Sequence, residues 1–426
     1  MLKEYVDWMY ERGSSNGDHT LKNIEKLLDK LGNPQDKIKV IHVAGTNGKG
    51  STCNYIYNTL SKKLKCGIFI SPYMESILES ITINEEKISK NDFINYIDEI
   101  KPVVEQLDIE GYHNTYFEVL TAIMYKYFYD KKVDVAVVEV GLGGKLDSTN
   151  IIKKPIASVI TTISMDHINV LGNNIVEIAE NKGGIIKQDA DVFIYPQEKA
   201  VMEKLSEIAQ SKNSKVYTFE KSEIEILETG EGKNLYNFRE YKNVQTKLLG
   251  IHQVYNSALA LTVLDHFKEK FDLSEEEIKE GIRETKNSGR LETISDNPKV
   301  IIDGSHNLEA MDALIESLKN FNYNRLILGF SILKDKDYKK ILPKLIPLAD
   351  EVVITNINNP RAFTLEELEN EVKQYSKNVK AIENIIEAYE YTKSISKEND
   401  LILWCGSLYL IREIRNYEKG IEVYDN

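Results

Sequence analysis

A glycine-rich turn that carries one lysine and one serine is the segment of this chain best suited to chemistry. It follows an apolar run at residues 40–44 and reads Gly45-Thr46-Asn47-Gly48-Lys49-Gly50-Ser51. Its glycines would let the backbone bend so that several N–H groups face one anion, and Lys49 would add a positive charge there. A helix that begins near Ser51 would add the positive end of its dipole. The turn therefore predicts a phosphate-binding site.

The spacing within this turn departs from the general P-loop pattern. That pattern requires a glycine where the chain has Val43, and a serine or threonine directly after the lysine, where the chain has Gly50. On this segment alone, a glycine-rich hairpin with an incidental lysine is an open alternative. The remaining polar residues of the chain must therefore support or weaken the assignment.

A carboxylate lies near the carboxyl end of another apolar run. Glu139 belongs to the strand predicted at 133–140, and Gly141-Leu142-Gly143-Gly144 follows it. In open parallel sheets, ligands bind beyond the carboxyl ends of the strands. A carboxylate inside an apolar strand is costly unless something binds it, and hard cations take oxygen ligands. We interpret Glu139 as a magnesium ligand beside the phosphate turn; an edge carboxylate paired with a lysine is the alternative.

Two basic side chains, His167 and Lys182, lie after or at the end of later predicted elements. His167 comes after the strand predicted at 157–163, where it would be either a second metal ligand or a solvated loop histidine. Lys182 ends a short helix before two glycines, a place that by itself is typical of a surface lysine at a helix C-terminus. The residues alone leave both alternatives open.

A second strand end of the same kind occurs late in the chain. Asp303 follows the apolar run at 300–302, and His306 and Asn307 come directly behind it. A carboxylate, an imidazole and an amide at one strand end, added to the earlier ones, favour a shared ligand site over unrelated solvated turns.

The elements that would position these groups alternate between short apolar runs and helical patterns. An N-terminal helix is predicted within 18–31, and apolar runs follow at 67–70, 133–140, 157–163, 192–195 and 215–218. After residue 221, alternating polar and apolar residues predict a β-hairpin, and helices are predicted at 253–267 and 274–285. The alternation restarts with strands at 300–302, 326–330, 351–355 and 401–404. Such alternation is typical of parallel sheets covered by helices.

This pattern predicts an α/β protein with two domains. The first, 1–286, would hold an N-terminal P-loop-type, mostly parallel sheet flanked by helices. The second, 290–426, would be a smaller Rossmann-like α/β domain. The linker would be Lys286-Asn287-Ser288-Gly289, which combines residues common in loops.

Composition limits the classes of function. The chain has 426 residues and a formal net charge of −13, which argues against a broad nucleic-acid surface. No apolar run approaches the roughly 20 residues that span a bilayer, and three cysteines make no disulfide framework. We therefore expect a cytoplasmic protein with neither nucleic-acid nor membrane partners. An anionic substrate would need a local cationic pocket, for which Lys49, Lys145, Lys182 and Arg290 are candidates.

The ordered set of motifs resembles folylpolyglutamate synthase and bifunctional dihydrofolate synthase, within the Mur-ligase superfamily of ATP-dependent amide ligases. The matching segments extend over nearly the whole chain: the turn at 45–51, Ser71-Pro72, Phe117-Glu118, Glu139 with 141–144, Asp147-Ser148-Thr149-Asn150, Asp166-His167, Leu171-Gly172, Lys182-Gly183-Gly184-Ile185, Gly250-Ile251-His252-Gln253 with Asn256, Gly289-Arg290-Leu291-Glu292, Asp303-Gly304-Ser305-His306-Asn307 and Gly406-Ser407-Leu408-Tyr409.

The resemblance implies roles around a nucleotide and two metal ions. The turn, from Thr46 and Asn47 through Gly48 and Gly50, would bind the phosphates of ATP together with Lys49. Ser51 and Glu139 would hold one Mg²⁺ and His167 a second, while Lys182 matches the family lysine that carbon dioxide carbamylates into a metal ligand. Lys49, Lys182 and His167 would thus be the catalytic residues.

Further roles concern the rest of ATP and the two other substrates. Asn256 would contact the adenine, and Arg290 and Asp303 would reach phosphate and ribose. His306 and Ser407 would line the glutamate side, and Ser71 and Tyr73 the acceptor side.

The function implied is that of an ATP-dependent ligase. It would add L-glutamate to a folate, to dihydropteroate or to both, through an acyl phosphate, with only small-molecule partners and as a monomer. Several positions depart from the family: Tyr73 replaces histidine, Ser80 and Lys145 replace arginine, Asn181 replaces glutamate and Leu308 replaces proline. Because two of these lie in the acceptor region, the choice between dihydropteroate and folate stays open.

Two other functions remain as alternatives. One is a Mur-type amide ligase with a different carboxylate acceptor. The other is a P-loop phosphotransferase or nucleotide-binding protein that forms no amide. The second domain, with Asp303 and His306 facing an interdomain cleft, argues against a simple kinase.

Overall fold

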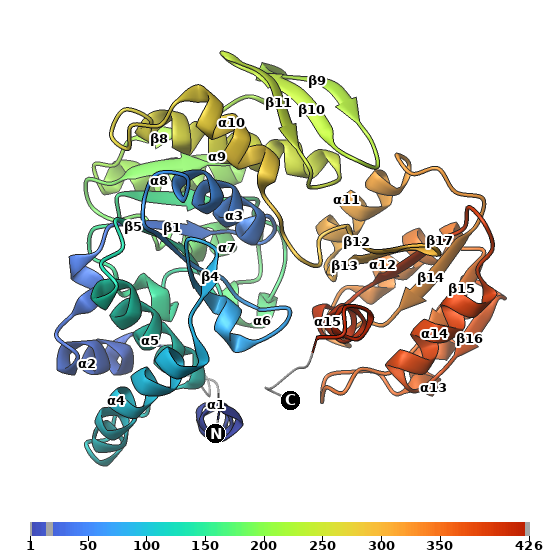
Figure 1. The fold of residues 1–426 in the computed structure, drawn as a ribbon, viewed down its shortest axis with the longest axis horizontal. Coiled ribbons are helices and arrows are strands. Elements are labelled where there is room, and N and C mark those ends of the chain that lie inside the picture. Colours follow the sequence, from blue (N-terminus) through green and yellow to red (C-terminus); the bar gives the residue numbers. More distant parts are fainter. Residues whose placement is uncertain (1, 14–19, 422–426) are drawn as a thin grey trace.

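The computed structural model describes residues 2–13 and 20–421. Two α/β units lie side by side, one formed by the blue-to-yellow part of the chain and the other by the orange-to-red part (Figure 1). The mixed α/β class with mostly parallel sheets, predicted from the sequence, is confirmed. The domain limits of 1–286 and 290–426 stay a prediction.

The first unit contains a sheet of eight strands in the order β4-β3-β2-β5-β1-β6-β7-β8. Their bounds are β1 Val40–Ala44, β2 Cys66–Phe69, β3 Ile81–Ile83, β4 Glu86–Lys87, β5 Val135–Glu139, β6 Ala157–Ile160, β7 Asp191–Ile194 and β8 Val216–Tyr217. The six strands from β2 to β8 run parallel, and β3 and β4 add an antiparallel edge that the sequence analysis missed. β1 and β5 are buried along their whole length, so the sheet needs helices on both faces.

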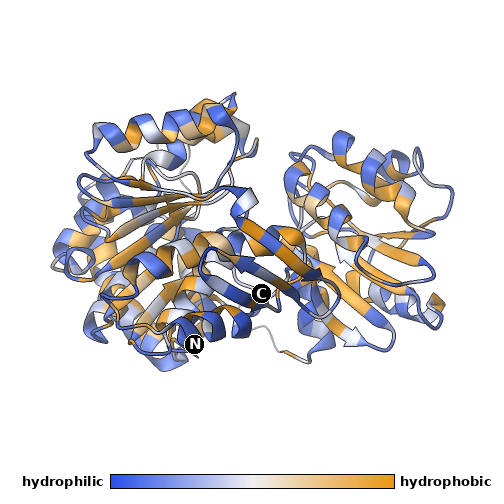
Figure 2. Ribbon diagram, turned by 90° about the horizontal axis from the view of Figure 1, so that it is seen from above, coloured by the Kyte–Doolittle hydropathy of each residue, from blue (hydrophilic) through white to orange (hydrophobic). Residues whose placement is uncertain are grey.

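Helices supply that cover. Their bounds are α1 Leu2–Glu11, α2 Lys22–Lys30, α3 Lys49–Leu60, α4 Lys90–Ile109, α5 Tyr116–Asp130, α6 Ile168–Leu171, α7 Ile175–Gly183, α8 Lys199–Ser211, α9 Ile251–Phe267 and α10 Glu275–Glu284. Short 3₁₀ turns of this unit are η1 Pro34–Lys37, η2 Ile77–Ser80, η3 Ser148–Ile151 and η4 Lys221–Glu223; a further one, η5 Ile346–Leu348, lies in the second unit. Apolar strands lie inside both units, with mixed helices around them (Figure 2).

Residues 224–246 form a three-stranded antiparallel sheet, where the sequence analysis predicted only a hairpin. The strands are β9 Ile224–Thr229, β10 Asn234–Phe238 and β11 Tyr241–Thr246. Tyr236 is fully buried, and its hydroxyl lies 2.6 Å from the hydroxyl of Ser257 on α9. A two-stranded hairpin is only marginally stable by itself, and the third strand together with α9 lets the sheet bury side chains such as Tyr236.

The second unit is a sheet in the order β12-β13-β17-β14-β15-β16, of which β12 is antiparallel. The bounds are β12 Glu292–Asp296, β13 Lys299–Asp303, β14 Leu326–Phe330, β15 Glu351–Ile354, β16 Val379–Ala381 and β17 Leu401–Cys405. Its helices are α11 Leu308–Leu318, α12 Tyr338–Leu345, α13 Leu365–Val372, α14 Ile385–Ile395 and α15 Leu408–Glu418. The edge strands β12 and β16 escaped prediction because both carry polar residues, and β16 has only three residues.

Arg415 of α15 joins the two units. Its side chain is nearly buried, donating to both carboxylate oxygens of Glu292 at 3.0 Å, to Glu75 at 2.9 Å and to the Ser288 hydroxyl at 3.1 Å. Glu75 belongs to the loop after β2, Ser288 to the connection between the units, and Glu292 to the start of β12 in the second unit. One guanidinium therefore holds the connection, the loop and the second unit together.

Within the described residues, the structure contains no helix that is both long and apolar enough to cross a membrane.

His42 in the middle of β1 gives the fold a measurable pH dependence. Its side chain is fully buried, with Nε2 2.8 Å from the Thr149 hydroxyl, and burial lowers its pKa from 6.5 to about 3. Between these values the unfolded chain binds more protons than the folded chain, so this group makes stability rise with pH from 3 to 6.5.

We expect His42→Gln to flatten the dependence of the free energy of unfolding on pH between 3 and 6.5. Urea unfolding at several pH values measures it, with His113→Gln on the exposed surface as the control. Parallel pH profiles for wild type and His42→Gln would contradict the assignment.

Candidate active site

The phosphate turn and the polar strand ends lie at one edge of the first sheet. In the parallel register, Val43 of β1 is opposite Glu139 of β5, and Ala44 is opposite Ile160 of β6. Because parallel strands end at the same edge, the segments that follow all three strands meet there. The sheet itself thus places Glu139 beside the glycine-rich turn.

The turn needs glycine at two positions. A Cβ on Gly45, whose φ is +153°, would lie 1.7 Å from Oγ1 of Thr161, and one on Gly48, at φ +84°, 2.6 Å from Oδ1 of Asn256. The structure begins α3 at Lys49, two residues before the predicted start near Ser51, because Gly48 ends the turn in the left-handed region. The free N–H groups of α3 therefore point into the turn.

Lys49 and Glu139 approach each other inside this edge. Lys49 Nζ donates to the carbonyls of Gly45 at 3.2 Å and Thr46 at 3.3 Å, and lies 4.0 Å from Oε1 of Glu139. Glu139 Oε2 accepts from the Ser71 N–H at 3.4 Å. Burial raises the pKa of Glu139 to about 7, although Lys49 opposes the shift. The lysine contact alone does not offset the burial of this carboxylate.

Lys182 is not a surface lysine at a helix end, the alternative that its sequence context allowed. It is 4% exposed, and Nζ donates to the carbonyl of Gly45 at 2.7 Å. Burial, and then the charge of Lys49, lowers its pKa to about 7. The last turn of α7 therefore points this amine into the phosphate turn.

Asp166 connects this edge to the second unit. Its carboxylate lies 3.0 Å from Nζ of Lys336, and both side chains are about nine-tenths buried. Burial would raise the pKa of Asp166, but Lys336 and then His167 lower it to about 2. His167 is itself partly exposed, at φ +49°, with Nε2 3.9 Å from Asp166. Lys336 was missed in the sequence because a lysine between two aspartates resembles a solvated surface.

The second unit contributes the strand end of β13 and the start of α15. Asp303 Oδ2 accepts from the Leu291 N–H at 2.8 Å, and Oδ1 from the Ser305 N–H at 2.9 Å. Nδ1 of His306 lies 2.8 Å from the carbonyl of Gly304; because a carbonyl only accepts, Nδ1 carries the proton and Nε2 has the free lone pair. Burial lowers the pKa of His306 to about 4, so it is neutral at pH 7.

Hydrogen bonds of Asn47, Asn307 and Asn287 connect the phosphate turn and α3 to the second unit and to the linker. Asn47 of the turn and Asn307 at the start of α11 exchange hydrogen bonds at 3.3 and 2.9 Å, and Asn47 also donates to Glu309 at 2.6 Å. From the connection, Asn287 donates to the Ser51 hydroxyl at 2.9 Å. The phosphate turn is thus contacted by both the second unit and the connection.

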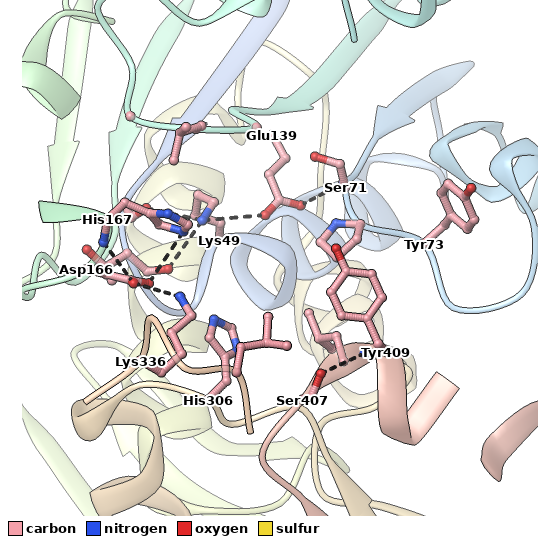
Figure 3. A pocket seen from close by; sticks show the side chains of 18 of the residues that line it. Lys49, Ser71, Tyr73, Glu139, Asp166, His167, His306, Lys336, Ser407 and Tyr409 are labelled. Atoms are coloured by element: carbon pink, nitrogen blue, oxygen red, sulfur yellow. Dashed lines mark hydrogen bonds and ion pairs between the residues drawn. The ribbon is translucent and has the colours of Figure 1, made fainter. Parts of the chain in front are cut away.

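Two cavities result, and Arg290 lines both. The larger, of about 480 Å³, is lined by predicted residues Thr46, Lys49, Ser71, Tyr73, Glu139, His167, Lys182, Arg290, His306 and Ser407 (Figure 3). The smaller, of about 110 Å³, is lined by Asn47, Gly48, Ser51, Asn256, Arg290 and Asp303. Gly50 lines neither, and neither does Lys145, which is exposed. The structure therefore brings together nearly all the residues singled out in the sequence.

Several residues of the larger cavity carried no signal in the sequence. They are Tyr10, Tyr116, Leu333, Lys336, Arg361 and Arg412. They come from separate elements, at positions that follow no common spacing, so only the fold assembles them.

Comparison with known proteins gives matches over both units. The Mur ligase middle domain matches residues 43–264, and the Mur ligase glutamate ligase domain matches residues 289–408. A dihydrofolate synthase/folylpolyglutamate synthase of Bacillus subtilis is 32% identical, over 97% of this chain and 99% of the relative. The structure of Mycobacterium tuberculosis folylpolyglutamate synthase complexed with ADP has a TM-score of 0.90 at 31% identity, over 98% of each chain. A folylpolyglutamate synthase solved with AMPPCP and folate has a TM-score of 0.83 at 28% identity, over 98% of this chain and 99% of the other.

The buried Asp166–Lys336 pair predicts a strong energetic coupling. Lys336→Met leaves the Asp166 carboxylate buried without its partner and should lower the free energy of unfolding by about 3 kcal/mol. The double variant Asp166→Asn with Lys336→Met should lose less than Lys336→Met alone. Urea unfolding measures both effects.

The matched control is Lys344→Met, which removes a lysine from the half-exposed pair with Asp312 and should change stability by about 0.5 kcal/mol or less. A loss in the double variant equal to the sum of the losses in Lys336→Met and in Asp166→Asn, each measured alone, would show that Asp166 and Lys336 do not interact.

Proposed function

This chain belongs to the folylpolyglutamate and dihydrofolate synthase family of ATP-dependent glutamate ligases, and we propose that its acceptor is a folate, dihydropteroate or both. The observation that carries the proposal is the position of four side chains at one edge of the first sheet. Lys49, Glu139 and Lys182 line the larger cavity, and Arg290 lines both this cavity and the smaller one. The family predicted from the motifs is confirmed by the matches over nearly the whole chain.

The smaller cavity suits the nucleoside part of ATP. Asn256 offers an amide for the adenine, and Asp303 and Arg290 face the same space with a carboxylate and a guanidinium. The phosphates would continue along the turn, where Lys49 and the N-terminus of α3 provide positive charge. The first unit would thus bind ATP, and the second would bring glutamate to it.

The residues at this edge fit Mg²⁺. Ser51 and Glu139 present nearly buried oxygen donors, and burial raises the pKa of Glu139 to about 7 although Lys49, 4.0 Å away, opposes the shift. His167 stands at the next strand end. Within residues 2–13 and 20–421, no three His, Cys, Asp or Glu side chains form a complete metal cluster, so water and phosphate would supply the other ligands. Bound there, magnesium would offset the negative charge of the transferring phosphoryl group.

Lys182 is suited to carbamylation. Only a neutral amine attacks carbon dioxide, and the lowered pKa of about 7 leaves much of this amine neutral near pH 7. The amine nitrogen bonds to the carbon and releases a proton to water, so the product is an anionic carbamate. A carbamate beside Lys49 would replace a repulsive contact between two cations with an attractive one, and it would add oxygen donors for a metal ion.

The reaction would proceed in two steps. The acceptor carboxylate takes the γ-phosphoryl group of ATP, which leaves ADP and an acyl phosphate. The amino group of glutamate then attacks the acyl carbon, phosphate leaves, and an amide remains. Neutral His306 offers its Nε2 lone pair to the amine, and Ser407 at the start of α15 lies in the same cavity. Ser71 and Tyr73 line the acceptor side.

We also propose that the protein acts on small molecules as a cytoplasmic monomer; its acidic net charge of −13 and its three unpaired cysteines support this proposal.

An acceptor panel tests the function. With ATP, Mg²⁺ and glutamate, we expect phosphate release only when tetrahydrofolate or dihydropteroate is present, and mass spectrometry should find the glutamyl product. Turnover that needs glutamate but no pterin would indicate a Mur-type ligase with another acceptor. ADP formation without any amine would indicate a phosphotransferase.

Lys182→Ala tests the carbamate. We expect ATP affinity to change by less than about three-fold while kcat falls by about 100-fold or more, because a metal ligand of the transition state is lost. Added formate or acetate should restore part of the activity by supplying a carboxylate. Lys199→Ala, at an exposed lysine of α8, is the control. Full activity of Lys182→Ala would exclude the carbamate.

A further inference from the structure

One part of the larger cavity is lined by three tyrosine side chains, of which the proposed function assigns a role only to Tyr73. Tyr10 of α1 and Tyr116 of α5 stack with ring centres 4.8 Å apart and planes 12° from parallel. The Tyr10 hydroxyl forms a hydrogen bond with the hydroxyl of Tyr73, from the loop after β2. All three tyrosines line the cavity. These three side chains form one aromatic surface of the cavity, here called the tyrosine wall.

Arg412 reaches the tyrosine wall from the other unit. It lies on α15, and its guanidinium carbon is 4.6 Å from the centre of the Tyr73 ring. One nitrogen donates to the carbonyl of Glu75 at 3.3 Å, in the same loop as Tyr73. The cation–π contact and the carbonyl together hold the guanidinium at the cavity surface, where Arg412 is half-buried.

The position of Arg412 on α15 sets its distance from the reacting end. Ser407 precedes the helix and lines the same cavity, and Arg412 follows five positions later. At the rise of an α-helix, that is about 7.5 Å along the axis. Ser407 on the glutamate side and Arg412 can therefore contact groups that lie apart from each other in the same cavity.

We propose that Arg412 binds the α-carboxylate of a glutamate already attached to the acceptor, and that it thereby selects folates over dihydropteroate. The inference rests on the proposed function. In a folate the γ-carboxylate reacts, and the α-carboxylate remains a few bonds away as a second anion. Dihydropteroate has one carboxylate, which is the reacting group, so Arg412 gains no partner from it. A planar guanidinium suits a carboxylate because it donates two parallel hydrogen bonds.

Other residues near the wall are less suited to this role. Arg361 also lines the cavity, but it forms an exposed ion pair with Asp335 at 2.9 Å. Ser80, where the sequence departs from the family's arginine, is fully buried and does not line the cavity, so that position brings no charge to the acceptor. Arg412 of α15, by contrast, contacts the tyrosine wall directly.

The test compares two acceptors in wild type, Arg412→Gln and Arg412→Lys, with KM and kcat measured at saturating ATP and glutamate. We expect Arg412→Gln to raise KM for tetrahydrofolate about 10-fold or more while kcat changes less than about two-fold. KM for dihydropteroate should stay within about two-fold of wild type; if wild type does not turn it over, its inhibition constant replaces KM. Arg412→Lys keeps the charge and should recover part of the loss. Arg239→Gln, at the distant turn between β10 and β11, is the control for removing an arginine.

The outcomes distinguish a failure of the role of Arg412 from a failure of the proposed function. An unchanged KM for tetrahydrofolate in Arg412→Gln, or equal losses with both acceptors, would overturn the role of Arg412 and leave the proposed function intact. No recovery in Arg412→Lys would indicate packing and would also overturn it. Wild type without turnover on any pterin would refute the proposed function and this inference with it. Thermal unfolding of each variant shows whether it remains folded.

Discussion

The candidate site depends on ionisable side chains that are buried at one edge of a parallel sheet. Burial moves the pKa of Glu139 up and that of Lys182 down, so both reach about 7 from opposite directions. Neither group gains enough from its protein neighbours to offset desolvation. A ligand that brings phosphate and metal to this edge would supply the missing partners, so the protein is built to gain stability from binding. The glycines of the turn allow its backbone to approach Asn256 and Thr161 closely, which keeps the turn at this edge of the sheet.

The connection between the two units is part of the site. Asn287 contacts Ser51, Arg415 holds Ser288, and Leu291, just before β12, contacts Asp303. A linker that only joined two domains would lie on the surface and make few such contacts. Here it touches the phosphate turn at one end and the first strand pair of the second unit at the other.

The sequence predicts the fold class and the family because both rest on local signals. Apolar runs mark the buried parallel strands, and the turn at 45–51 has a spacing that the family shares. The α/β class and the ligase family are confirmed, whereas the roles of the individual site residues stay predictions. Edge strands such as β16 were missed because a half-exposed strand is short and polar.

Residues of the site that pair across the units were missed for a different reason. Lys336 and Arg412 belong to no sequence motif. Their partners, Asp166 and Tyr73, lie in the other unit and are 170 and 339 positions away in the chain. Such pairs are set by tertiary structure alone. By contrast, Glu118 is part of a local capping box with Thr115 that opens α5, and a motif of this kind can be read from the sequence.

The hydrogen bond from Asn287 to the hydroxyl of Ser51 has a thermodynamic consequence. The same oxygen is the one that we assign to a metal ion next to the phosphates, so the position of the connection and the loading of the nucleotide act on one atom. If nucleotide binding shifts the equilibrium between two arrangements of the units by some factor, then the nucleotide affinities of the two arrangements differ by the same factor. A ligase that must exclude water from a reactive phosphate would thus hold its nucleotide most tightly in one arrangement of the units and release it in another.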